Sequence, residues 1–213
     1  MLHPILRVPL LCHRIAKPLK IDGDLNDWGK QYNVELSRKE QVHDKPWGGI
    51  TDLSGRFMLA WDATNLYVGG VVQDDKFVQP YSAEEAWRGD SVVVGISSSR
   101  SVLWEQVGYG DSDHEFGMAL LNGVTPMIQR LWGMDMGAVK PQVVIKRQGT
   151  EISYEAAIPW TQLRPLTPQN SLLFGLCFQI NDEDGRGRGY MEWGGAMGDA
   201  KRPGQFPSVR LVP

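Results

Sequence analysis

Residues 142–158 read QVVIKRQGTEISYEAAI, and this segment is the most informative one for the fold class. It holds two runs with β-branched and aromatic side chains, separated by Gln148-Gly149-Thr150. Such runs are typical of β-strands, and a short glycine-containing turn between two of them predicts a β-hairpin. The stretch therefore indicates an antiparallel β-protein.

Strand signals of the same kind recur along most of the chain. Further strands are predicted at residues 56–61, 65–73, 91–98, 114–121, 125–132 and 172–180. Helical signals are short and fall near residues 24–28, 82–87 and 159–163. Many short strands without long helices predict an all-β fold, a single antiparallel β-sandwich of roughly ten strands.

Local rules give several polar residues a structural role. Asp24 is expected to cap the first helical turn. Ser82 is predicted to cap the second, with Glu85 at capping-box spacing, and Pro159 suits the first position of the third. Glu155 lies in an otherwise apolar strand and needs a partner if it is buried.

The composition is that of a globular protein. With 213 residues the chain can form one large domain, and its 42% hydrophobic and 22% charged residues can build a sizeable core. The net charge of −3 and the lack of a basic stripe give no support to nucleic-acid binding. No apolar run approaches the roughly 20 residues that span a bilayer, so no membrane partner is expected.

The segment Ile5–Cys12 is apolar, but Arg7 and Pro9 interrupt it and no small-residue cleavage site follows. A signal peptide in the chain as given is therefore not indicated. This favours a cytoplasmic location, unless a leader was removed or the chain was cut from a secreted protein. Cys177 lies within the apolar run LCFQI and is expected to be a small buried core residue. A disulfide with Cys12 is the less favoured alternative.

Two tryptophans stand beside turn-forming or acidic residues at predicted strand ends. Trp87 opens the segment WRGDSV, and Trp193 closes YMEW. Rings in such places offer flat apolar faces without exposing the core, and sugars can stack on them. The alternative is that both are core or edge tryptophans.

Seven blocks in order resemble the family 9 carbohydrate-binding modules, within the wider group of DOMON-like β-sandwiches (jelly-roll or immunoglobulin-like). The blocks are Ile21–Trp28, Trp61–Val68, Val72–Asp75, Trp87–Val92, Tyr154–Trp160, Asn181–Trp193 and Phe206–Leu211. The resemblance implies a module-like β-sandwich at residues 19–213, with residues 1–18 as an N-terminal extension packed on it. It also implies a non-catalytic, monomeric domain associated with glycoside hydrolases and polysaccharide catabolism.

In the family, residues that match Trp87 and Trp193 form a clamp that sandwiches a sugar, often the reducing end of a chain. The resemblance therefore implies a cleft between these two rings that takes oligosaccharide or polysaccharide ends. The candidate carbohydrate-binding residues are Trp87, Trp193, Arg88, Asp74, Glu192 and Arg188.

The chain also departs from the family pattern. An acidic residue expected on the strand after the first tryptophan corresponds to Val93 or Val94, and a basic residue on the next strand corresponds to Gly117. A site without these groups loses orientation and selectivity. Arg88, Arg186, Arg188 and Glu192 are possible substitutes.

The loop NDEDG at residues 181–185 concentrates oxygen ligands of the kind that calcium prefers. Family members commonly hold structural calcium, so Asn181, Asp182 and Asp184 are candidate ligands. The loop is not an EF-hand, and solvated turn residues are the alternative.

Other chemistry has weaker support. The sequence lacks a G-x-S-x-G motif, and its four histidines lack zinc-site spacing, so the chain is not expected to be an enzyme. If sugar binding is lost, a DOMON-like sandwich can act as a protein-interaction or haem-binding domain. The candidate haem ligands are His114, Met118, Met127, Met134 and Met136.

Overall fold

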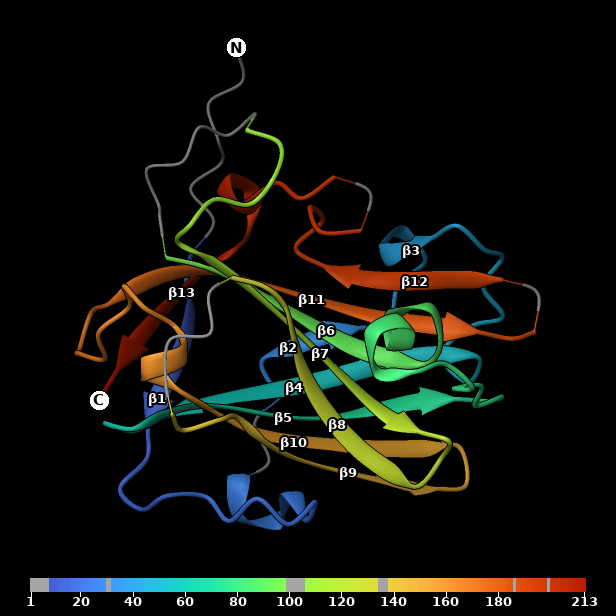
Figure 1. Cartoon of the computed structure of the whole chain (residues 1–213), viewed down its shortest axis with the longest axis horizontal. Coiled ribbons are helices and arrows are strands. Elements are labelled where there is room, and N and C mark those ends of the chain that lie inside the picture. Colours follow the sequence, from blue (N-terminus) through green and yellow to red (C-terminus); the bar gives the residue numbers. More distant parts are fainter. Residues whose placement is uncertain (1–7, 30–31, 99–105, 134–137, 186, 199) are drawn as a thin grey trace.

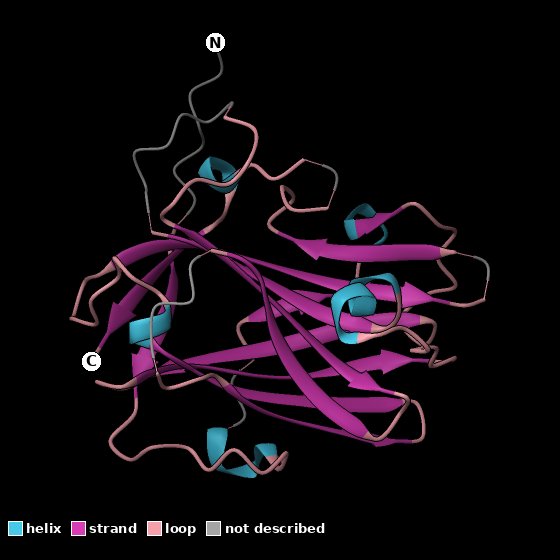
Figure 2. Cartoon of the chain, viewed as in Figure 1, coloured by secondary structure: helices cyan, strands magenta, loops and turns pink. Residues whose placement is uncertain are grey.

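The computed structural model describes residues 8–29, 32–98, 106–133, 138–185, 187–198 and 200–213. Strands dominate this part of the chain, and the helices are short 3-10 turns (Figures 1 and 2). The strands are β1 (Leu10–Arg14), β2 (Val34–Leu36), β3 (Val42–His43), β4 (Leu53–Trp61), β5 (Asn65–Asp74), β6 (Ser91–Ser97), β7 (Asp113–Leu121), β8 (Thr125–Trp132), β9 (Gln142–Gln148), β10 (Glu151–Pro159), β11 (Leu173–Glu183), β12 (Arg188–Trp193) and β13 (Ser208–Val212). The 3-10 helices are η1 (Leu25–Trp28), η2 (Lys39–Gln41), η3 (Ala83–Arg88), η4 (Trp160–Gln162) and η5 (Pro203–Gln205). The prediction of an all-β fold is confirmed.

The strands form one large sheet whose main order is β8-β7-β6-β11-β13-β1-β4-β5-β10-β9. Off this path, β12 pairs with β11 and β3, and β2 pairs with β4. Most ladders are antiparallel, but β1 runs parallel to both of its neighbours, β13 and β4. Part of the predicted N-terminal extension is therefore a strand inside the sheet.

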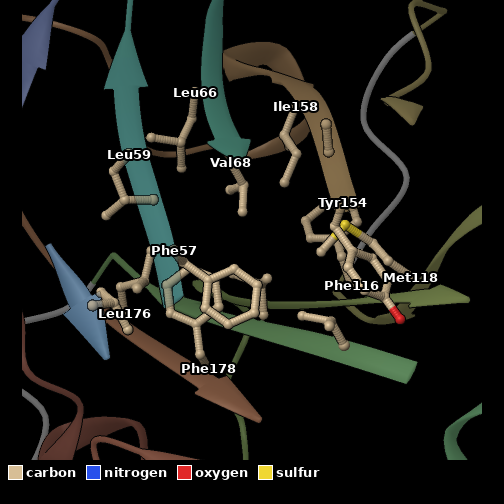
Figure 3. Packing of buried hydrophobic residues seen from close by; sticks show 14 of the residues in the cluster. Phe57, Leu59, Leu66, Val68, Phe116, Met118, Tyr154, Ile158, Leu176 and Phe178 are labelled. Carbon is tan, nitrogen blue, oxygen red and sulfur yellow. The ribbon is translucent and has the colours of Figure 1, made fainter. Parts of the chain in front are cut away.

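The sheet turns back on itself, so that β6, β7 and β11 face β4, β5 and β10 across a shared core (Figures 1 and 3). At its centre the rings of Phe57 and Phe178 stack with centroids 4.5 Å apart. Tyr154 and Phe116 are also buried there. Each fully buried large apolar side chain contributes about 1.5–3 kcal/mol, so this core supplies most of the driving force for folding.

The hairpin at residues 142–158 is present as predicted. Gln148 ends β9, Glu151 begins β10, and Gly149 has a φ of 64°. Glycine adopts this left-handed conformation without steric cost.

The three predicted helical turns are present, and two of their caps differ from expectation. The Asp24 side chain accepts a hydrogen bond from the Asn26 N–H and caps η1 as predicted. Ser82 is at the N-cap of η3 but forms no side-chain capping bond. Pro159 is the N-cap of η4, one position earlier than predicted.

Glu155 is fully buried and has the partners that its burial requires. It accepts hydrogen bonds from the Asp22 N–H at 2.8 Å, the Gly23 N–H at 2.6 Å and the Trp28 Nε1–H at 2.8 Å. One carboxylate of β10 thus fixes the segment before and within η1.

Cys12 and Cys177 are buried and form no disulfide. None of the helices in the described residues could cross a membrane.

Candidate functional site

A cleft of about 440 Å³ lies on the face of β11, β6, β7 and β8 that points away from the shared core. Its floor follows from the strand register: Gln179 of β11 pairs with Val93 of β6, which pairs with Gly117 of β7, which pairs with Gln129 of β8. Side chains alternate between the two faces of a strand. Because Val92 and Val94 are in the core, Val93 and its partners face the cleft.

Trp87 and Arg188 form one wall of this cleft. Trp87, in η3, is 44% exposed. The Arg188 guanidinium carbon lies 5.3 Å from the centre of the Trp87 ring and 4.8 Å from that of Tyr190, and Arg188 Nε donates to Asn181 Oδ1 at 2.8 Å. A guanidinium at this distance from an aromatic ring is attracted to it, so the exposed indole has a fixed neighbour.

The floor carries two amide acceptors without partners. Gln179, which is 5% exposed, donates from Nε2 to Asn181 Oδ1 at 2.5 Å. Its Oε1 and the Oε1 of Gln129 are buried and accept no hydrogen bond from the described residues. A buried acceptor is costly unless it is paired, so both oxygens are suited to a ligand that donates hydroxyl protons.

Charged groups close the other side of the cleft. Lys201 Nζ pairs with Glu115 Oε2 at 2.7 Å, and both residues line the cleft with Glu84. Lys201 Nζ also lies 5.6 Å from the centre of the Tyr109 ring. The cleft therefore combines one exposed ring and neutral amides with several charged groups, which are Arg188, Arg130, Glu84 and the Glu115–Lys201 pair.

The structure does not bring Trp193 to this cleft, which corrects the prediction of a clamp. Along β12, Trp193 pairs with Phe178, and its ring centroid lies 6.4 Å from that of Phe178 on the core side. Its partly exposed edge lines a separate hollow with Leu10 and Pro207. The physical reason is that side chains alternate between the two faces of a strand. Trp193 is five positions after Arg188 in β12, so it faces the core while Arg188 faces the cleft.

Three further candidate sugar-binding residues also lie away from the cleft. Glu192 is buried, and its Oε1 accepts from the Ala196 N–H at 2.8 Å and from the Met197 N–H. Asp74 is buried among other carboxylates. Arg88 pairs with Glu85 at 2.8 Å and lines a neighbouring hollow that shares Trp87 and Arg188 with the cleft. Of the six candidates, only Trp87 and Arg188 line the cleft itself.

The two positions that depart from the family pattern do face the cleft. Val93 belongs to a second apolar cluster with Cys177, Met197 and Phe206. A Cβ on Gly117 would lie 3.1 Å from Leu131 Cδ1, so Leu131 fills the space beside this glycine. The floor is apolar at these positions, and its polar groups come from other strands.

The predicted calcium ligands do not converge as a set. Asn181 faces the cleft side, where its Nδ2 donates to Ser91 Oγ at 3.0 Å, whereas Asp182 and Asp184 face the other way. Their carboxylates lie with that of Asp52, with ligand oxygens within 4.8 Å of one another, but the Lys45 ammonium already contacts both Asp182 and Asp184. The set does not fit a calcium ion while this ammonium is in place.

A second acidic group consists of Asp74, Asp90 and Asp182, all buried. Burial, followed by the Asp74 carboxylate, raises the pKa of Asp90 to about 9. Asp90 Oδ1 accepts from the Glu183 N–H at 2.8 Å, and its Oδ2 accepts from the Val78 N–H. The first bond holds the start of β6 against the end of β11, and the second ties it to the segment between β5 and η3.

The haem alternative finds no support at His114. Its Nε2 lies 2.8 Å from the Arg164 carbonyl oxygen and its Nδ1 lies 3.0 Å from Arg130 NH1, so both ring nitrogens contact protein atoms. Met118 is fully buried in the shared core. Met134, Met136 and the possible substitute Arg186 lie outside the described residues.

Sequence reasoning missed six polar residues that line the cleft: Glu84, Glu115, Gln129, Arg130, Gln179 and Lys201. A signal for two of them was available. Gln179 lies between the apolar residues Phe178 and Ile180, so alternation turns it away from the core. Glu115 stands two positions before Gly117 and therefore lies on the same strand face as that glycine. For Lys201, which follows β12 in a loop, the sequence held no such signal.

Solved structures of other proteins have a similar architecture. Two solved structures of a family 9 carbohydrate-binding module from Caldicellulosiruptor kristjanssonii have the same fold. The one in complex with cellotriose has a TM-score of 0.73 at 18% identity and covers 96% of this chain and 94% of its own. The one in complex with glucose has a TM-score of 0.71 at 18% identity and covers 94% and 95%.

Among curated proteins, none matches this sequence. The family model described as "Carbohydrate family 9 binding domain-like" matches residues 21–213, which is nearly the whole chain. The chain therefore belongs to the carbohydrate family 9 binding domain-like family.

Proposed function

We propose that this protein binds carbohydrate in the Trp87 cleft without catalysing a reaction. One face of a sugar ring lies on the exposed indole, and its hydroxyl groups donate to the free amide oxygens of Gln179 and Gln129. The observation that carries this proposal is the combination, in one cleft, of an exposed aromatic ring and buried acceptors that have no partner in the described part of the chain. Sugars offer the matching combination of apolar C–H faces and hydroxyl donors.

The family assignment supports this function, and the two similar structures contain cellotriose and glucose. Cello-oligosaccharides are therefore the first ligands to test. A protein that binds them without cleaving them would serve a polysaccharide-degrading system by holding it on its substrate.

The proposal uses one tryptophan instead of two. Aromatic contacts contribute about 0.5–1.5 kcal/mol beyond burial for each good ring pair. One ring with a few hydrogen bonds should give weak binding, on the order of millimolar or about −4 kcal/mol. Selectivity among neutral hexoses and pentoses should be poor, because Val93 and Gly117 supply no charged hydrogen-bonding group.

The proposal extends to the reducing end of the sugar chain. An oligosaccharide whose terminal unit has been reduced to an open-chain alditol no longer presents a ring at that end. If the terminal ring is the one that stacks on Trp87, reduction should remove most of the affinity. Equal binding of cellotriose and its alditol would instead place an internal unit in the cleft.

Calorimetric titration with glucose, cellobiose and cellotriose tests the function. Trp87→Ala should remove detectable binding. Trp132→Ala is the matched control, since Trp132 is 47% exposed but does not line the cleft. Loss of binding in both variants, or in neither, would count against the proposed site, and release of shorter sugars during incubation would count against a binding role alone.

A further inference from the structure

The ammonium group of Lys45 contacts two carboxylates at the end of β11: that of Asp182, within the strand, and that of Asp184, just after it. Lys45 Nζ is 3.0 Å from Asp184 Oδ2 and also contacts Asp182 Oδ2. The Lys45 side chain is 10% exposed and that of Asp182 is 1% exposed. A charge this deeply buried is tolerated only when it is paired, so the lysine and the two aspartates form one unit.

The neighbouring strand leaves room for the lysine. Gly189 of β12 pairs with Asp182 of β11, and a Cβ on Gly189 would overlap the Cγ and Cδ atoms of Lys45. Any larger residue at position 189 would displace the methylene stem and withdraw the ammonium group. The glycine therefore allows Lys45 to reach Asp182 across β12.

A second ammonium group acts on the same loop. Lys76 Nζ donates to the Asp184 carbonyl oxygen, and the Lys76 N–H donates to Asp74 Oδ1 at 2.8 Å. Two lysines from distant segments thus supply positive charge where the family resemblance places a calcium ion. A bound calcium ion takes six to eight oxygen ligands, and an ammonium group between two of those carboxylates excludes it.

We propose that Lys45 is an internal counter-ion that stands in place of a structural metal ion. Its ammonium group pairs with Asp182 and Asp184, offsets one of their two negative charges, and ties the end of β11 to the segment before Trp47. Without Lys45, the carboxylates of Asp52, Asp182 and Asp184 would lie within 4.8 Å of one another with no ammonium between them. Asp182 Oδ1, which is buried and accepts no hydrogen bond from the described residues, would be available as a further ligand atom.

Thermal unfolding in EDTA and in millimolar calcium chloride tests this proposal without any sugar. Lys45→Met keeps a similar stem and removes the charge, and Lys17→Met, at an exposed position, is the control. The wild type and the control should have the same Tm in both buffers. Lys45→Met should have a lower Tm in EDTA, and calcium should raise it, because a ligand that binds only the folded state stabilises that state.

Several results would overturn the proposal. A wild-type Tm that falls in EDTA or rises with calcium would show that a metal ion binds beside Lys45. A Lys45→Met variant whose Tm ignores calcium would show that the lysine does not stand at a cation position. Lys45→Arg, which keeps the charge, should remain insensitive to calcium, and a calcium-dependent Tm in this variant would also contradict the proposal.

If Lys45→Met does not fold in EDTA, calcium should restore its folded circular dichroism spectrum. Failure to fold in both buffers would likewise overturn the proposal. Because the readout is stability, this experiment can fail while sugar binding in the Trp87 cleft stands, and the reverse also holds.

Discussion

The guanidinium of Arg188 lies over the exposed ring of Trp87, 5.3 Å from its centre. Arg188 is in turn fixed by its hydrogen bond to Asn181 and by the ring of Tyr190. The indole is therefore positioned by β12 and β11, although it belongs to η3. A ring that is already ordered loses little conformational entropy when a ligand binds.

Arg188→Met should weaken sugar binding about two- to fivefold, since a cation–π contact of this kind contributes ~0.5–1 kcal/mol. The physical reason is that Trp87 loses the neighbour that fixes its orientation. Calorimetric titration measures the change. Arg88→Met, at the arginine that pairs with Glu85 outside the cleft, should bind sugar as the wild type does, and equal losses in both variants would contradict this role of Arg188.

Gln179→Leu should weaken sugar binding by about tenfold, or ~1.4 kcal/mol, which is the scale of one hydrogen bond. Its Tm should change little, because the substitution also removes a buried acceptor that has no partner in the described residues. Titration and thermal unfolding of the same variant check both statements. A large drop in Tm with unchanged affinity would make Gln179 a purely structural residue.

Glu155→Gln should lower the free energy of unfolding by about 1–3 kcal/mol. The neutral amide can no longer accept charge-assisted bonds from Asp22, Gly23 and Trp28 together. Chemical denaturation measures the loss. Glu151→Gln is the control on the same strand, because its side chain is exposed and should change stability by less than about 0.5 kcal/mol.

Stability should fall as the pH drops below about 6.5, and His114 should account for part of the loss. Burial, helped by the charge of Arg130, lowers the pKa of His114. The unfolded chain therefore binds a proton before the folded one does, so acid favours unfolding and stability rises with pH across this window. His114→Gln should flatten the pH dependence of Tm between pH 7 and about 5. A variant whose Tm depends on pH as that of the wild type does would contradict this role of His114.

The sequence was sufficient for features that depend on local chemistry. The hairpin around Gly149 and the Asp24 cap follow from turn and capping preferences. The cost of burying a charge predicted that Glu155 would need partners, but not which ones. The family pattern pointed to Gly117 and to Val93 or Val94; the structure places Val93 and Gly117 at the cleft and Val94 in the core.

Facing directions and distant contacts were harder to predict. Trp193 was assigned to the cleft although its strand alternation turns it toward Phe178, and Asn181 was grouped with Asp182 although adjacent strand residues face opposite sides. Lys45 meets Asp184 across 139 positions of sequence. Such pairings arise only when β11, β12 and the segment after β3 come together.

Sugar binding in the cleft requires that Trp87, and not Trp193, holds the sugar. Calorimetric titration of Trp87→Ala and Trp193→Ala with cellotriose, on variants shown to be folded by circular dichroism, tests this directly. We expect Trp87→Ala to lose detectable binding and Trp193→Ala to keep it, with a lower Tm because Trp193 packs on Phe178. Wild-type affinity in Trp87→Ala, or loss of binding in a folded Trp193→Ala, would contradict the account.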